Sequence, residues 1–112
     1  MAGADRLQLA RDLYGAYVSG ERSVVEALLA EDFEFFSPAD AGIGRERYFE
    51  RCWPNSELID GFEFVRLAEL GDEVLVTYES TKKDGSSFRN TEVLTFDGEK
   101  LRRAEVYFGW AL

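Results

Sequence analysis

Residues 87–110 read SFRNTEVLTFDGEKLRRAEVYFGW, with apolar and polar side chains alternating on both sides of one turn. Aspartate followed by glycine at 97–98 is typical of a tight β-hairpin turn. Successive residues of a strand point to opposite faces, so the stretch predicts paired strands at 87–96 and 100–110. One face then carries the even-numbered residues Phe88, Asn90, Glu92, Leu94, Phe96, Arg102, Ala104, Val106, Phe108 and Trp110.

Asn90 and Glu92 lie in the middle of this largely apolar face. A buried amide or carboxylate needs partners, and a ligand cavity can supply them. We therefore expect a small-molecule pocket over this face, with Glu92 as its candidate catalytic acid or base. In the alternative interpretation, Glu92 and Asn90 are structural groups that bond to each other or to Tyr78.

Other candidate ligand-binding residues are large or apolar side chains expected on inward faces. Tyr78 shares its parity with Val74 and Val76, so its hydroxyl is a possible donor toward the pocket. The full set of predicted substrate-binding residues is Tyr14, Phe35, Trp53, Tyr78, Asn90, Val106 and Phe108.

The rest of the chain predicts helices first and strands afterwards, which is the α+β pattern. Apolar residues at helical spacing predict a helix over 4–19, ended by Gly20. Ser23 and Glu26 form a capping-box pattern that would open a short helix at 24–29. Further predicted elements are a strand at 33–37, a helix at 45–53 that closes before a proline, and strands at 61–70 and 73–82. We interpret 42–44, Gly-Ile-Gly, as a flexible lead into the third helix. A second Asp-Gly pair at 84–85 predicts that the last three strands form an antiparallel meander.

Composition limits the function classes. The 112 residues predict one domain, 1–112, and 22 acidic against 13 basic residues leave a net charge of −9. This charge argues against non-specific binding to nucleic acid or anionic membrane. The chain has no histidine, which removes histidine-based triads and histidine-ligated zinc or haem, and we expect no metal and no cofactor. The single cysteine, Cys52, and the lack of a leader-like or membrane-spanning apolar run favour a cytoplasmic protein.

Several segments in combination resemble the NTF2-like superfamily, whose members include ketosteroid isomerases and SnoaL-like polyketide cyclases. They are residues 17–21 (YVSGE), 25–33 (VEALLAEDF), 43–46 (IGRE), 71–74 (GDEV) and 96–101 (FDGEKL). The resemblance implies a cone-shaped, cystatin-like α+β fold, with N-terminal helices packed in a strongly curved mixed sheet and a pocket at the wide end. The fold hosts enzymes, binding proteins and dimerisation modules, so it does not by itself imply a reaction.

The resemblance to ketosteroid isomerases places Leu13 at the position of their first-helix tyrosine, with Tyr14 one residue away. It places Ser37 where their aspartate base lies, and Glu92 where their second acid lies. One of three roles is therefore retained. Scytalone dehydratase and the SnoaL-like cyclases rely on histidine, which this chain lacks.

Three function classes follow from the sequence. The first is a protein with an apolar small-molecule pocket, either a carrier or a lyase or isomerase that uses Glu92. The second is a non-catalytic dimerisation or interaction module, and the third is a cyclase-type enzyme without histidine. We also expect a homodimer, because Val93, Arg103, Glu105 and Tyr107 form a mixed apolar and charged face on the opposite side of the last two strands.

Overall fold

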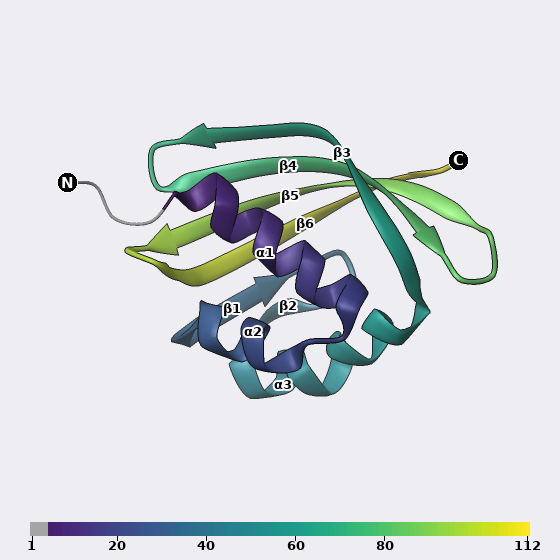
Figure 1. Cartoon of the computed structure of the whole chain (residues 1–112). Coiled ribbons are helices and arrows are strands. Elements are labelled where there is room, and N and C mark those ends of the chain that lie inside the picture. The colour runs from purple at the N-terminus through teal and green to yellow at the C-terminus, as the bar shows by residue number, and fades with distance from the viewer. Residues whose placement is uncertain (1–4) are drawn as a thin grey trace.

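The computed structural model describes residues 5–112, in which helices cover one face of a six-stranded sheet (Figure 1). The predicted α+β order is confirmed. The first part of the chain forms α1 (Arg6–Ser19), α2 (Arg22–Leu28), β1 (Leu29–Phe36), β2 (Ala41–Gly44), α3 (Arg45–Arg51) and the 3₁₀ helix η1 (Trp53–Leu58). The remaining strands are β3 (Ile59–Leu70), β4 (Glu73–Lys82), β5 (Ser87–Asp97) and β6 (Lys100–Ala111). Helix α1 crosses the sheet, and α2 and α3 lie near β1 and β2.

The strand order is β2-β1-β6-β5-β4-β3. Strands β3 to β6 pair antiparallel in sequence, which confirms the predicted meander, and β1 pairs parallel with β6. The sheet is therefore mixed. Strand β5 occupies an interior position, which places Asn90 and Glu92 between residues of β4 and β6 rather than at an edge.

Two register shifts in β6 correct the predicted alternation of its residues. Near one end, Thr95 pairs with Arg103 but Phe96 pairs with Leu101, so Leu101 is buried in place of Arg102. Near the other end, Asn90 pairs with Phe108 but Arg89 pairs with Trp110. Because one residue is inserted at each β-bulge, Trp110 lies on the face of Arg89 and not on that of Phe108. The Arg89 guanidinium lies over the Trp110 ring, 5.3 Å from its centroid.

Helix ends show which local signals were correct. Gly20 has the left-handed φ of 75° and ends α1 as predicted, and Asp5 caps its start by accepting from the backbone of Leu7 and Gln8. The predicted capping box at Ser23 is wrong, because α2 begins at Arg22 and Ser23 lies inside the helix. The N-cap residue of α2 is Glu21, which makes no side-chain capping bond.

The segment around 41–58 differs most from the prediction. Residues 41–44 form the short strand β2 against β1, and not a flexible lead into the helix. Helix α3 ends at Arg51, and the chain tightens into η1 with Pro54 in its first turn. A four-residue strand with two glycines has too few side chains to show alternation, so its pairing is decided by β1.

The core lies between α1 and the inner face of the sheet. Ala10, Leu13 and Tyr14 of α1 are buried against residues such as Val74 and Leu94. The Tyr14 ring meets Phe62 edge-on, with centroids 5.1 Å apart. A cavity lies between the helices and the inner face of β4, β5 and β6.

Candidate functional site

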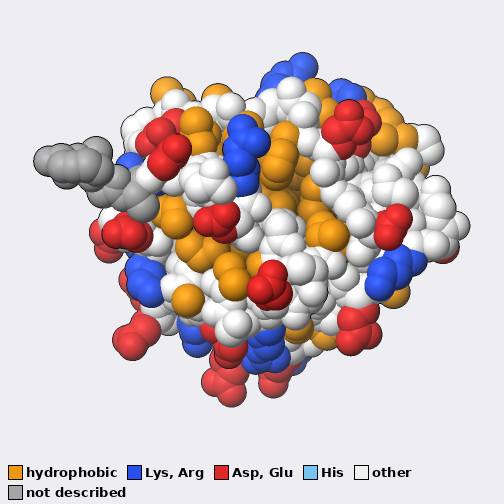
Figure 2. All heavy atoms as spheres, viewed as in Figure 1, with side chains coloured by type: hydrophobic (Ala, Val, Ile, Leu, Met, Phe, Trp, Pro, Cys, Tyr) orange, Lys and Arg blue, Asp and Glu red, His pale blue; other side chains and the backbone are white. Residues whose placement is uncertain are grey.

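A cavity of about 610 Å³ lies against the inner face of the sheet. This volume is within the range of about 300–1,000 Å³ that is typical of small-molecule sites. Many of its lining residues are aromatic: Tyr14, Tyr17, Phe33, Phe35, Tyr48, Phe62, Tyr78, Phe88, Phe108 and Trp110. Figure 2 shows apolar side chains reaching the surface between charged ones on the face over which α1 lies. The lining includes Phe108, which is 59% exposed, so the cavity is open to solvent, and its apolar side chains suit an apolar body.

Glu92 is a polar centre of these walls. The Tyr78 hydroxyl on β4 donates to Glu92 Oε2 on β5 at 2.6 Å. Asn90 Nδ2 donates to the Tyr78 hydroxyl at 3.4 Å, and Asn90 Oδ1 accepts from the Gly109 backbone N–H at 3.1 Å. The β6 bulge at Gly109 thus fixes the Asn90 amide by a hydrogen bond. The amide donates to the Tyr78 hydroxyl, and that hydroxyl donates to the Glu92 carboxylate.

Tyr14 projects from α1 beside the same carboxylate. Its hydroxyl is buried and makes no hydrogen bond of standard geometry with any described residue. Burial, and secondly the adjacent Glu92 charge, raise the pKa of Tyr14 well above its ordinary value. Tyr14 therefore presents an unpartnered hydroxyl next to Glu92.

The ionisation of Glu92 is governed by its surroundings. Burial raises its pKa above the ordinary value, while hydrogen bonding from Tyr78 and the nearby Tyr14 hydroxyl oppose that shift. Solvent still reaches part of Glu92 through the cavity, although protein surrounds the carboxylate. No cation among residues 5–112 forms an ion pair with it. The site can therefore hold or release a proton at Glu92 nearer to neutral pH than an exposed glutamate can.

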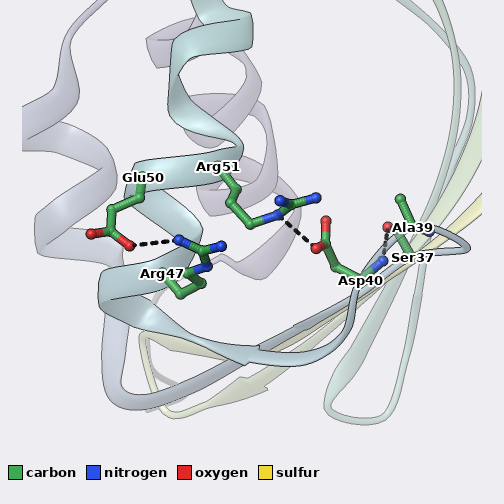
Figure 3. Close-up of polar contacts among 6 residues, drawn as sticks. All are labelled: Ser37, Ala39, Asp40, Arg47, Glu50 and Arg51. Atoms are coloured by element: carbon green, nitrogen blue, oxygen red, sulfur yellow. Dashed lines mark hydrogen bonds and ion pairs between the residues drawn. The ribbon is translucent and has the colours of Figure 1, made fainter.

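A second polar group lies at the turn after β1. Arg51 Nε of α3 is 2.7 Å from Asp40 Oδ1, as Figure 3 shows. Ser37 Oγ accepts from the backbone N–H groups of Ala39 and Asp40, at 3.2 and 3.1 Å, and so orders the turn. Ser37, Asp40 and Arg51 all line the cavity. The second ion pair in Figure 3, between Arg47 and Glu50, joins two residues of α3.

The structure brings most of the predicted site residues together. Glu92, Tyr14, Phe35, Tyr78, Asn90, Val106 and Phe108 all line the cavity. Trp53 is the exception, because it is absent from the lining and packs on Tyr17, with centroids 4.9 Å apart. Phe108 is 59% exposed, which places it at the cavity rim, while Val106 is 9% exposed.

Sequence reasoning missed Tyr17, Asp40, Arg51 and Lys82, which also line the cavity. The Ser-x-x-Asp pattern at 37–40 is typical of a side-chain-stabilised turn and could have indicated that Asp40 is held in place. Both Leu13 and Tyr14 border the cavity, but only Tyr14 brings a hydroxyl to Glu92. No signal in the sequence indicated that Arg51 and Lys82 would reach the same space.

The sequence comparison shows the family, and the comparison with solved structures shows the fold. The SnoaL-like domain matches residues 10–104, most of the chain. This chain belongs to the SnoaL-like domain family. No curated protein sequence matches it. The predicted resemblance to NTF2-like proteins and the predicted α+β fold are confirmed.

Three solved structures illustrate the fold of this SnoaL-like protein. A protein from Kribbella flavida aligns with a TM-score of 0.82 at 16% identity, covering 92% of this chain and 85% of its own. An NTF2-like protein of unknown function from Burkholderia pseudomallei aligns with a TM-score of 0.74 at 18% identity, over 95% and 92% of the two chains. A protein with a ketosteroid isomerase-like fold from Catenulispora acidiphila, in complex with trimethylamine, gives 0.70 at 17% identity, over 90% and 85%. These identities establish a shared fold.

The described part of the chain shows neither a metal site nor a membrane helix. Within residues 5–112, no three His, Cys, Asp or Glu side chains gather so that they could hold a metal ion. None of the helices described there is long and apolar enough to cross a membrane.

Proposed function

We propose that this SnoaL-like protein binds a small, largely apolar organic molecule in its cavity, with a polar group of the ligand against Glu92. The observation that carries the proposal is the Glu92 carboxylate, which has no ion-pair partner among the described residues, set among aromatic side chains in an open cavity of about 610 Å³. Apolar surface supplies affinity, and a few fixed polar groups orient the ligand. The trimethylamine bound to the Catenulispora acidiphila protein supports the idea that this fold accommodates small organic molecules.

Filling the cavity tests the proposal. Val106→Phe adds bulk beside Glu92, while Val65→Phe adds the same bulk on β3 at a position that is 40% exposed. The probe is the neutral fluorophore N-phenyl-1-naphthylamine, and its affinity is measured by fluorescence titration. We expect the wild type and Val65→Phe to bind it, and Val106→Phe to lose at least about tenfold in affinity because the ligand and the added ring compete for one space. Equal affinity of all three proteins for the probe would show that the probe does not bind in the cavity.

Proton transfer at Glu92 is a second candidate function. The raised pKa of Glu92 favours it, since a general acid or base is most effective when its pKa approaches the working pH. The test is exchange of the hydrogen next to the carbonyl of a cyclic β,γ-unsaturated ketone in deuterated water. Catalysed exchange that Glu92→Gln abolishes supports a lyase or isomerase, and exchange that survives Glu92→Gln rules Glu92 out as the base.

The homodimer remains part of the proposal. Tyr107 is 55% exposed on the outer face and donates to Glu105 at 3.1 Å. Arg103 Nε lies 3.8 Å from the same Glu105 carboxylate. A two-fold axis would let such a mixed face meet its own copy, with Tyr107 as the apolar contact. A purely interacting module would use this face without ligand binding, and the fluorophore titration separates the two. The cytoplasmic location stays a prediction that rests on the single cysteine.

A further inference from the structure

We propose that the ligand of this cavity is a small organic amine, bound as its ammonium cation between Glu92 and the aromatic walls. This inference rests on the proposed binding function and adds the chemical class of the ligand.

The first support is that Glu92 has no ion-pair partner among the described residues. Two carboxylates line it, Glu92 and Asp40, and Asp40 is already paired with Arg51 at 2.7 Å. The other lining cation, Lys82, has its ammonium 5.4 Å from the centroid of the Phe88 ring. Among the described residues Glu92 therefore accepts a hydrogen bond from Tyr78 but forms no ion pair. A bound cation would supply a counter-charge.

The second support is hydrogen-bonding capacity. Tyr78 bonds to Glu92 Oε2, and no described residue donates to Glu92 Oε1. An ionised carboxylate accepts several hydrogen bonds, so Oε1 has room for a ligand N–H. A charge-assisted bond of this kind is stronger than the bond that a neutral hydroxyl would make.

The third support is the aromatic lining. Tyr14 and Tyr17 come from α1, Tyr78 from β4 and Phe108 from β6, so rings border the cavity from several elements. Ring faces attract cations, most strongly when the cation has lost its water, and aromatic enclosures are a recurrent means of binding ammonium groups. A net charge of −9 further favours the approach of a cation.

The groups that face Glu92 allow a pH test. They are Tyr14 and Tyr17 from α1, Tyr78 from β4, and Cys52 after α3, whose pKa burial raises to about 11. The charged groups in the same lining are the paired Asp40 and Arg51, and Lys82. Burial raises the pKa of each tyrosine as well, so the tyrosines and Cys52 stay neutral while Glu92 loses its proton. Ammonium affinity should therefore increase with pH, as Glu92 becomes charged.

The experiment compares benzylammonium with benzyl alcohol, a neutral ligand of similar size, by calorimetric titration of the full chain. In the wild type we expect benzylammonium to bind at least about tenfold more tightly, because it pairs with Glu92 and the rings. In Glu92→Gln the ratio of the two affinities, benzylammonium to benzyl alcohol, should fall to about one, since a neutral amide of similar size replaces the carboxylate. Glu99→Gln is the matched control, because it removes one charge from an exposed turn and should leave the ratio unchanged.

Each result has a distinct meaning. Equal affinity for the two ligands in the wild type overturns the amine inference and leaves the binding function intact. Binding of neither ligand, together with no binding of N-phenyl-1-naphthylamine, overturns the proposed function itself. If Glu92→Gln does not fold, the wild type is titrated from about pH 5 to about pH 8, because a carboxyl with a raised pKa gains its charge above the ordinary glutamate value. Benzylammonium affinity should increase over this range while benzyl alcohol affinity stays constant, and a constant benzylammonium affinity overturns the inference.

Discussion

At the scale of single residues, the carboxyl of Glu92 is a titratable group whose surroundings differ strongly from water. The folded protein raises its pKa above the value of 4.5 for an exposed glutamate, chiefly by burial. The folded state therefore holds the Glu92 proton more tightly than the unfolded chain does. The contribution of this group to stability is complete below the unfolded pKa and is lost as pH increases through the folded pKa.

Glu92→Gln tests this linkage, because glutamine resembles the protonated form and does not titrate. We expect the free energy of unfolding of the variant, relative to wild type, to increase as the pH is raised from about 4 to about 8. The measurement is urea unfolding at several pH values, with Glu99→Gln as the exposed control. If the unfolding free energies of Glu92→Gln and wild type change with pH in the same way, the pKa of Glu92 is not raised.

Tyr78→Phe tests the hydrogen bond to Glu92. The variant keeps the ring but leaves the carboxylate without its 2.6 Å donor, so we expect a loss of about 1–3 kcal/mol in unfolding free energy. The pKa of Glu92 should increase further, measured by NMR titration of its carboxyl carbon, because the bond from Tyr78 lowers it in the wild type. Tyr107→Phe removes an exposed hydroxyl bonded to Glu105, and we expect it to change stability by less than about 0.5 kcal/mol. Equal effects of the two variants would contradict the role assigned to Tyr78.

At the scale of secondary-structure elements, the β6 bulge links the backbone to the site. A Cβ at Gly109 would collide with the backbone carbonyl oxygen of Arg89, which cannot rotate away as a side chain could. The same residue donates its N–H to Asn90 Oδ1. The bulge thus requires glycine and also orients the amide that supports Tyr78.

We predict that Gly109→Ala destabilises the protein by about 2 kcal/mol or more, because the β5–β6 pairing must shift to admit the methyl group. Gly61→Ala on β3 is the matched control, since a Cβ there meets no atom within 4 Å. Thermal unfolding of both variants provides the comparison. A Gly109→Ala protein as stable as Gly61→Ala would show that the bulge tolerates a side chain.

At the scale of the whole molecule, the sheet has one face toward the helices and cavity and one outer face that includes Val93, Arg103, Glu105 and Tyr107. We expect sedimentation equilibrium to give about twice the 12.7 kDa chain mass at micromolar concentration, because this outer face pairs with a second copy. Tyr107→Asp should shift the protein toward monomer by placing a charge in the apolar contact, whereas Val65→Asp on β3 should not. A wild-type mass near 12.7 kDa would contradict the homodimer.

The sequence by itself determined the order of the main elements and the inward position of Glu92. Strand β4 was predicted with its observed ends, and the two Asp-Gly pairs defined the meander, because period-two alternation and turn chemistry are local properties. Placing Tyr78, Asn90 and Glu92 on one inner face needed nothing more than this alternation.

Only the tertiary structure decided the details that complete the cavity. The bulge near the start of β6 puts Leu101 on the inner face, where alternation predicts Arg102. The bulge near its end puts Trp110 on the face of Arg89. Trp53 moved out of the lining because the chain tightens into η1, and Asp40 met Arg51 across the turn after β1. Each of these outcomes depends on how separate elements pack or pair, and alternation within one segment carries no information about an inserted residue or a distant partner.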